Sequence, residues 1–349
     1  MGEKLKTSIA ILKEIKKPLK ILKLEVPDPK KNQIVIKINF TYICGSQMNE
    51  IYGNRGKDKY LPHSLGHEAS GTIFKIGKNV KKFKIGQKVV LSWIKKKESA
   101  SILPYYLTKN NKKISSGMVS TFSEFVIVSK DRVYSIPQNL PMDIAALLGC
   151  ALPTGFGIVH KFARDIDKGK FVSIYGIGGV GLMVLIALKQ LGFKKIITID
   201  KNQKNLKIAK KIGVMYACSL NYFNKKIVDQ KIKKSNIALN IEISGNEKMT
   251  QSAINNLDAK GKVIIAGNIK KGNFIKLNPY DLIFGKNLLG FSGNDVSLEK
   301  NLKKYIAILK KFGLNKVRKF YKSYQFKHIN KAIADFKSGK VLRPLIKIN

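Results

Sequence analysis

The amino-acid sequence predicts a two-domain α/β protein, in which a mainly β domain precedes a doubly wound parallel sheet. Three observations predict this class. The chain has 349 residues, which is long for a single domain. Its first part contains short apolar strands separated by turns, with no long helix before about residue 142. Beyond about residue 150, apolar strands alternate with helical stretches, as they do in a parallel sheet.

The strands of the first part follow from alternating or continuous apolar runs that end at turn residues. They are predicted at 33–39, 70–76, 88–91 and 121–128. Gly77-Lys78-Asn79, Gly86 and Pro137 supply turns between or after them. The segment 95–120 is rich in Lys and Ser and has the weakest pattern of the chain, so a long surface loop is expected there.

The second part begins with an apolar run at 171–175, a glycine-rich turn and a helical stretch. The predicted elements are strands at 171–175, 195–199, 237–243 and 262–266, with helices at 182–191 and up to about 212. A tail follows from about residue 293, with helices near 298–312 and 328–338 and a last strand at 345–348. We therefore expect domains at 1–152 and 153–292 and a C-terminal segment at 293–349.

The region 171–188 carries no charge and is barely long enough to span a bilayer. Four glycines interrupt it, so it is interpreted as a buried strand, turn and helix, and no membrane partner is expected. The start of the chain lacks the pattern of a signal peptide. Three cysteines are too few for a disulfide framework, which favours a cytoplasmic location.

The charge is unusual, because 66 Lys and Arg stand against 22 Asp and Glu, giving a formal net charge of +44. Such a charge is typical of nucleic-acid-binding proteins. However, only five of the basic residues are Arg, the residue that base readout and bidentate phosphate contacts favour, and the lysines are spread along the whole chain. We expect a solvated lysine-rich surface without specific nucleic-acid binding, and a functional basic field remains the alternative. A solvated lysine-rich surface and a functional basic field would both attract anionic small molecules.

The turn Gly176-Ile177-Gly178-Gly179-Val180-Gly181 fits the pattern G-x-G-x-x-G. It follows a predicted strand, opens a predicted helix, and precedes Asp200 at the end of the next strand, which is the context of a dinucleotide site. The glycines permit a tight turn and a close approach of pyrophosphate to the helix N-terminus. Asp200 can accept hydrogen bonds from ribose hydroxyls and would repel a 2′-phosphate. The prediction is therefore NAD, although Lys201 and Lys204 could neutralise the phosphate of NADP.

Cys44, His67 and Cys150 are candidate zinc ligands, since two thiolates and one imidazole leave a fourth tetrahedral position open. An open position is typical of a catalytic zinc. On composition alone, two small buried cysteines and one core histidine are the better explanation, because the three residues lie far apart in the sequence.

A resemblance separates these alternatives. Gly66-His67-Glu68 followed by Ala69-Ser70-Gly71 resembles the G-H-E-x-x-G signature of the zinc-dependent medium-chain alcohol dehydrogenases. Gly149-Cys150 followed by Thr154-Gly155-Phe156-Gly157 resembles the third-ligand segment of that family, and the turn at 175–181 resembles its nucleotide turn. The resemblance covers essentially the whole chain. It implies a GroES-like β-barrel catalytic domain, a Rossmann NAD-binding domain and a C-terminal segment that returns to the first domain.

The resemblance also implies roles for single residues. Cys44, His67 and Cys150 would bind the catalytic zinc, with Glu68 beside them as an exchangeable ligand. Ser46 would take the proton of the substrate hydroxyl. The remaining expected roles are nicotinamide contact by Thr154, pyrophosphate contact by Arg343, and a substrate wall from Trp93 and Phe122, for which ordinary core aromatics remain the alternative.

Three departures from the family pattern stand out. No cysteine lies between Cys44 and Cys150, so the structural zinc of the family is expected to be absent. Gln47 stands where the family usually has an Asp that orients the zinc-binding histidine. Asn49 replaces a histidine that ends the proton relay in some relatives, and His63, nearby, is expected to be an exposed turn residue.

The expected function is therefore zinc-dependent hydride transfer between an alcohol and NAD, by a cytoplasmic homodimer or homotetramer. The missing structural zinc and the lysine excess favour a polyol or an anionic sugar derivative as the alcohol. Two alternatives remain: a zinc-free quinone or enoyl-type reductase of the same superfamily, and a basic nucleic-acid-binding protein on this scaffold.

Overall fold

The computed structural model describes residues 4–96, 103–224 and 236–349. The chain divides into two compact units. Unit 1 comprises Met1–Cys150, Ser297–Lys303 and Gly313–Asn349, and unit 2 comprises Ala151–Val296 and Lys304–Phe312. The domain limits expected from the sequence stay a prediction.

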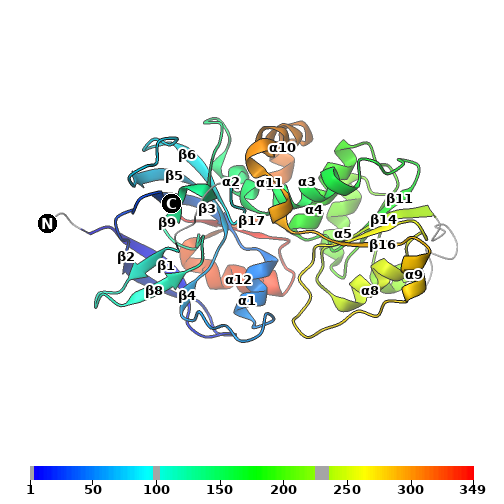
Figure 1. Cartoon of the computed structure of the whole chain (residues 1–349), viewed down its shortest axis with the longest axis horizontal. Helices are drawn as coiled ribbons and strands as arrows, with labels where there is room; N and C mark the ends of the chain where they lie inside the picture. Colours follow the sequence, from blue (N-terminus) through cyan, green and yellow to red (C-terminus); the bar gives the residue numbers. More distant parts are fainter. Residues whose placement is uncertain (1–3, 97–102, 225–235) are drawn as a thin grey trace. The chain divides into compact units, whose positions relative to one another are not determined.

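Unit 1 contains a small closed β-barrel and a larger sheet (Figure 1). The barrel order is β1 (Lys6–Leu12), β2 (Lys20–Glu25), β7 (Tyr105–Leu107), β8 (Lys113–Ser116) and β4 (His63–Ser64). The sheet order is β10 (Val133–Ser135), β6 (Lys88–Ser92), β5 (Glu68–Ile76), β3 (Gln33–Tyr42), β18 (Pro344–Lys347) and β17 (Lys322–Gln325), with β9 (Phe125–Ser129) also paired to β3.

The long strand β3 holds unit 1 together because both of its faces are buried. Ile34, Ile36 and Ile38 pack in one apolar cluster, while Val35 on the opposite face packs in another. At its C-terminal end, β3 pairs antiparallel with β18, so the end of the chain completes the sheet from which Cys44 emerges. The short helices of this unit are α1 (Gly45–Ile51), α2 (Met142–Ala145), η2 (Ala146–Gly149), α11 (Leu314–Arg318) and α12 (Ile329–Lys337).

The expected surface loop at 95–120 is wrong for residues 105–116. Residues 97–102 lie outside the described residues, but 105–116 form the antiparallel pair β7–β8 within the barrel. Tyr106 and Ile114 point into the barrel core, and Asn111 takes a positive φ of 56° in the turn between the strands. The alternation is only three to four residues long on each side, which is too short for a period of two to be recognised in the sequence.

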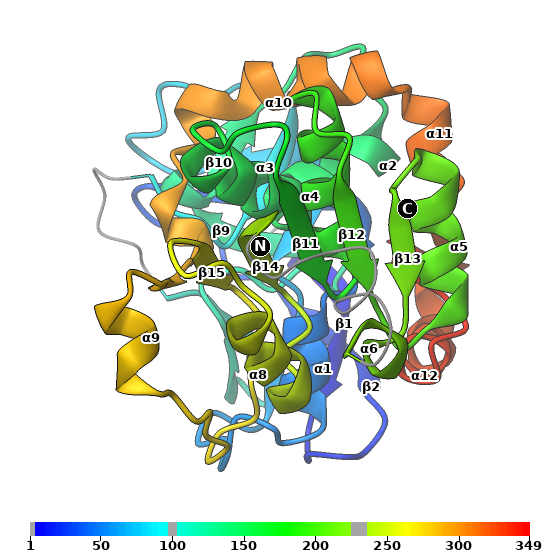
Figure 2. The ribbon, with the colours of Figure 1, turned by 90° about the vertical axis from the view of Figure 1, so that its right-hand side faces the viewer.

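Unit 2 is a six-stranded parallel sheet with helices on both faces (Figure 2). Its order is β13 (Tyr216–Cys218), β12 (Ile196–Ile199), β11 (Phe171–Tyr175), β14 (Ile237–Glu242), β15 (Lys262–Ile265) and β16 (Asn287–Gly290). Its helices are α3 (Ala151–Phe162), α4 (Gly179–Gln190), α5 (Gln203–Ile212), α6 (Leu220–Tyr222), α8 (Glu247–Asn255) and α9 (Pro279–Ile283). Helix α10 (Leu298–Phe312) is divided between the two units.

The strand order reverses between β11 and β14, which makes this point the topological switch of the sheet. Crossover connections are right-handed, so α4 and α5 cover one face and α8 covers the other. In such sheets a ligand binds at the carboxyl ends of the strands beside the switch. The predicted α/β fold class is thereby confirmed, and the uncharged region 171–188 is the strand β11 with most of helix α4. Among the described residues no single helix is long and apolar enough to cross a membrane, and one bent pair passes that test only jointly.

Candidate metal centre and dinucleotide site

Four side chains from three separate segments of unit 1 meet at one point. They are Cys44, His67, Glu68 and Cys150, whose candidate ligand atoms all lie within 4.8 Å of one another. Cys44 caps the N-terminus of α1, His67 and Glu68 stand at the start of β5, and Cys150 directly follows η2. The fold therefore assembles residues that the sequence separates by up to about a hundred positions.

Glycines beside the ligands allow the segments to approach closely. Gly66 has a φ of 93°, and a Cβ there would lie 2.4 Å from Oγ1 of Thr121. A Cβ on Gly149 would lie 2.4 Å from the carbonyl oxygen of Leu91 and 2.7 Å from Cβ of Glu68. Side chains at these two positions would push His67 and Cys150 away from the shared point.

A buried ion pair lies beneath the ligands. The guanidinium of Arg343, 1% exposed, contacts the carboxylate of Glu68, 0% exposed, and its Nε donates to the carbonyl oxygen of Ile43 at 3.3 Å. Burial would lower the pKa of Arg343, but the carboxylate of Glu68 and the nearby thiols outweigh it and raise that pKa. In this structure the side chain is buried against Glu68. The expected contact of Arg343 with pyrophosphate stays a prediction.

The thiols of the cluster are electrostatically coupled. A hydrogen bond from Cys150 and the charge of Arg343 hold the pKa of Cys44 well below its ordinary value, against the effect of burial. The same hydrogen bond, with burial, raises the pKa of Cys150. Cys218 lies in unit 2 within an apolar cluster, and burial raises its pKa to about 11, so it behaves as a neutral packing residue.

The donor set fits a zinc ion. Two thiol sulfurs and an imidazole nitrogen are soft and borderline donors, which zinc prefers over a hard cation such as Mg²⁺. Among the described residues, the buried polar atoms of the site without a hydrogen bond include Nε2 of His67 and Oγ of Ser46. Unpaired polar atoms beside such a donor set are consistent with a site that takes up an ion.

The other nitrogen of His67 contacts Gln47, which is buried in α1. The Nε2 atom of Gln47 hydrogen-bonds Nδ1 of His67, while Oε1 of the same amide accepts from the backbone N–H of Cys44 at 2.8 Å. The residue that departs from the family pattern therefore connects two candidate ligands.

The two expected substrate-wall aromatics have different environments. The ring of Trp93 lies 6.4 Å from that of His67 between centroids, and its backbone N–H donates to the carbonyl of His67. Phe122 is fully buried in an apolar cluster of unit 1, which favours the alternative of an ordinary core aromatic.

The two residues considered for the end of a proton relay are both engaged elsewhere. Oδ1 of Asn49 accepts from the side chain of Asn54 at 3.0 Å. His63 is not the exposed turn residue expected, because it lies in β4 with a side chain only 12% exposed and its Nε2 is 2.7 Å from Asp58.

In unit 2 the glycine turn joins β11 to α4 at the switch of the sheet. Gly176 has a φ of 98°, and a Cβ on Gly181 would lie 2.0 Å from the carbonyl oxygen of Gly176, so both positions need glycine for the fold itself. A Cβ on Gly178 would meet nothing within 4 Å. Its open face, before the free N–H groups of Gly179 and Val180, suits a dinucleotide pyrophosphate.

Asp200 follows β12 and takes part in the turn. Its Oδ2 accepts from the backbone N–H of Ile177 at 2.7 Å, and its Oδ1 accepts from the backbone N–H of Asn202 at 2.7 Å. The carboxylate therefore fixes the shape of the glycine turn and keeps further lone pairs for ribose hydroxyls. Thr154 lies in α3, one residue before Gly155, which packs against Met183 of α4.

A residue that sequence reasoning missed is Glu242, at the end of β14. It is fully buried, burial raises its pKa, and its Oε1 accepts from the backbone N–H groups of Ser244 and Gly245. Gly176 lies directly against Ser244, because a Cβ on it would come within 2.9 Å of Cα of Ser244. An acidic residue that ends an apolar strand was the available signal.

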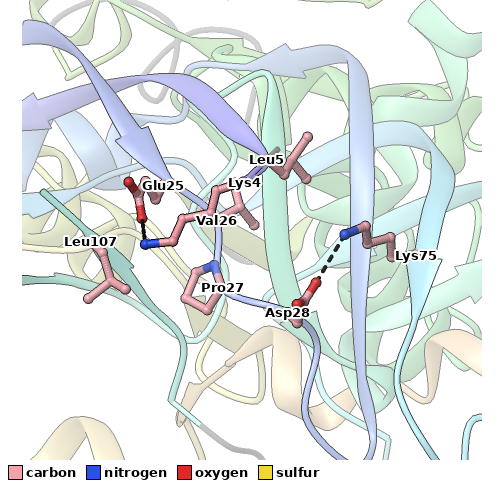
Figure 3. Close-up of a pocket in the computed structure, with 8 residues that line it drawn as sticks. All are labelled: Lys4, Leu5, Glu25, Val26, Pro27, Asp28, Lys75 and Leu107. Carbon is pink, nitrogen blue, oxygen red and sulfur yellow. Dashed lines mark hydrogen bonds and ion pairs between the residues drawn. The ribbon is translucent and has the colours of Figure 1, made fainter. Parts of the chain in front are cut away.

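A cavity of about 330 Å³ lies on unit 1, lined by Lys4, Leu5, Glu25, Val26, Pro27, Asp28, Lys75 and Leu107 (Figure 3). Its charged side chains satisfy one another, with Lys4 to Glu25 and Lys75 to Asp28 each at 3.0 Å. It contains no predicted site residue and we assign it no function.

Residues 30–138 match the family model of the alcohol dehydrogenase GroES-like domain, and residues 179–312 match that of the zinc-binding dehydrogenases. Together the two matches span more than half of the chain. The S-(hydroxymethyl)glutathione dehydrogenase of Saccharomyces cerevisiae is 27% identical, over 99% of this chain and 97% of its own.

Two solved structures have the same fold. A zinc-binding alcohol dehydrogenase domain protein from Burkholderia ambifaria superposes with a TM-score of 0.88 at 20% identity, covering 99% of this chain and 100% of its own. Benzyl alcohol dehydrogenase from Acinetobacter calcoaceticus gives 0.86 at 23% identity, with the same coverage.

The buried pair of Arg343 and Glu68 predicts a large effect on stability. Arg343→Met leaves the Glu68 carboxylate buried without its counter-charge, so the free energy of unfolding should fall by about 3–5 kcal/mol. Adding Glu68→Gln to that variant should recover much of the loss. Arg318→Met is the matched control, because Arg318 contacts Asp143 at the surface and an exposed pair contributes up to about 1 kcal/mol. Urea unfolding measures all three, and equal losses for both arginines would contradict the prediction.

Proposed function

The chain belongs to the medium-chain family of zinc-dependent alcohol dehydrogenases, and we propose that it oxidises or forms an alcohol with NAD and one catalytic zinc per chain. The observation that carries the proposal is the convergence of Cys44, His67 and Cys150 beside the buried hydroxyl of Ser46. Three protein ligands leave the open position that a catalytic zinc requires.

The chain's own residues have distinct tasks in this reaction. Zinc held by the three ligands supplies a Lewis acid that makes an alcohol hydroxyl acidic near neutral pH. Oγ of Ser46 accepts the hydroxyl proton. Asn49 cannot titrate, so the proton then leaves through a ribose hydroxyl to water. Glu68 stands beside the ligands as an exchangeable fourth donor, and Arg343 offsets its charge.

A bound NAD would supply the acceptor for the hydride of the carbinol carbon. The open face of Gly178 and the N–H groups at the start of α4 would bind its pyrophosphate, and Asp200 would accept hydrogen bonds from the ribose hydroxyls. Thr154 contacts the nicotinamide. The zinc-free reductase alternative loses support, because a reductase without metal has no need of two thiols and an imidazole at one point.

The substrate we propose is a polyol or an anionic sugar derivative. Trp93 lies against the ring of His67 and offers a flat apolar surface on which a sugar can stack. The net charge of +44 attracts anions. We propose no specific nucleic-acid or membrane partner and a cytoplasmic location, where the three cysteines stay reduced.

We also propose a homodimer formed along the edge strand β16. Strand β16 is an outer strand of its sheet and its residues are largely exposed. The preceding segment exposes large apolar side chains, with Ile283 73% and Phe284 65% exposed. Proteins usually cover an exposed apolar sheet edge. A second copy related by a twofold axis would pair the backbone hydrogen-bonding groups of the edge strand and bury its apolar side chains.

The proposed zinc chemistry predicts opposite results for two cysteine substitutions. Wild type should contain one zinc per chain and produce NADH from a member of an alcohol and polyol panel. Cys150→Ser should lose zinc and activity, whereas Cys218→Ser should keep both, because Cys218 lies in an apolar cluster of unit 2 and is not one of the four residues of the candidate metal group. Elemental analysis and NADH absorbance provide the measurements. Full activity in Cys150→Ser, or in zinc-free wild type, would overturn the proposal.

The two hydrogen bonds of Asp200 predict the behaviour of Asp200→Ser. Loss of the carboxylate should weaken NAD binding by about tenfold or more and relieve the repulsion of a 2′-phosphate. Because the carboxylate also holds the N–H of Ile177, NADP binding should not rise to the wild-type NAD level. Fluorescence titration with NADH and NADPH compares the two, and Asp258→Ser is a control outside the turn. A wild type that already prefers NADP would contradict the assignment.

The exposed edge predicts that Phe284→Asp produces a monomer, since it places a charge in the apolar interface. Ile85→Asp alters an equally exposed apolar residue of unit 1 and should remain a dimer. Light scattering at micromolar concentration distinguishes them. A monomeric wild type, or a dimeric Phe284→Asp protein, would show that this edge is not the interface.

A further inference from the structure

The amide of Gln47 connects two candidate zinc ligands, Cys44 and His67. A histidine that binds zinc through Nε2 needs a hydrogen-bond acceptor at Nδ1, and the amide presents a donor there. Gln47 is 2% exposed, so water does not replace the partners it lacks. Its side chain has one acceptor and one donor end. Its two neighbours are the backbone N–H of Cys44 and Nδ1 of His67.

The orientation of this amide is fixed by Cys44. A backbone N–H is always a donor, so the oxygen of Gln47 must face it, at 2.8 Å. The NH₂ group of the amide then faces Nδ1 of His67 and donates to it. An Nδ1 that accepts a hydrogen bond carries no proton, and a neutral imidazole then carries its one proton on Nε2.

Nε2 is, however, the nitrogen that faces the metal position. It lies 3.9 Å from Oε1 of Glu68 and has no hydrogen bond to the described residues, whereas Nδ1 is taken by Gln47. A zinc ion on Nε2 requires the proton on Nδ1, directly against the NH₂ group of Gln47. If the amide rotates by half a turn, its oxygen accepts from Nδ1 of His67. Its NH₂ group then faces the backbone N–H of Cys44, so two donors again face each other.

We propose that Gln47 is a positioning residue that stabilises the tautomer of His67 with its proton on Nε2, the nitrogen that zinc must take, so that this chain releases its zinc more readily than the same site with a carboxylate at position 47. The inference rests on the proposed zinc site. A carboxylate presents acceptors to both neighbours, so Gln47→Glu removes the conflict with almost no change of shape.

The test compares zinc affinity by competition with a chelator. Groups that hydrogen-bond a metal ligand change metal affinity by about 10–100-fold, and Gln47→Glu should bind zinc tighter by at least about tenfold. Gln87→Glu is a matched control. Gln87 also accepts from the backbone N–H three residues before it and donates to Oγ of Ser135, an oxygen that adapts to a carboxylate. Its zinc affinity should equal that of wild type.

A second measurement separates the tautomer from a general effect of added negative charge. The ¹⁵N resonances of His67 in zinc-stripped protein, identified by their loss in His67→Asn, should show the proton on Nε2 in wild type and on Nδ1 in Gln47→Glu. A wild-type proton on Nδ1, or equal zinc affinity of wild type and Gln47→Glu, would overturn the inference while leaving the proposed function intact. A wild type that takes up no zinc would overturn both.

Discussion

The metal centre depends on one buried charge, the guanidinium of Arg343. It contacts Glu68 at the start of β5, donates to the carbonyl of Ile43 just before Cys44, and lies 5.4 Å from the ring of Tyr42. The next residue, Pro344, accepts from the N–H of Ile43 and begins β18. A C-terminal segment therefore fixes the positions of ligand-bearing segments that lie about 300 residues earlier.

The charges around that guanidinium explain why the cluster suits a cation. Two thiolates and one carboxylate against one guanidinium leave two negative charges in a buried place. Burial of uncompensated charge is costly, and a divalent ion removes the cost. Without an ion the thiols share a proton, which is the origin of the opposite pKa changes of Cys44 and Cys150.

The family, the fold class and the parallel sheet were predictable from the sequence, because each has a strong local pattern. The glycine turn has its strand before it and Asp200 after it, and helix α10 has its predicted limits of 298–312. The hairpin β7–β8 was not predictable, since strands of three and four residues are too short for a period to emerge. The burial of Arg343 against Glu68 was equally invisible, because it depends on contacts between distant segments.

The sequence identified which residue types meet at the metal, but the direction of each hydrogen bond came only from the structure. From the sequence alone, Gln and Asp at position 47 are both suitable polar partners for His67. Only the position of the Cys44 N–H decides which end of the amide reaches the imidazole. Asp200 is a similar case, because the sequence predicts a ribose contact and the structure adds a bond to Ile177. One carboxylate therefore influences both the preference for NAD over NADP and the shape of the glycine turn. A substitution of Asp200 that changes the cofactor preference must also disturb the turn.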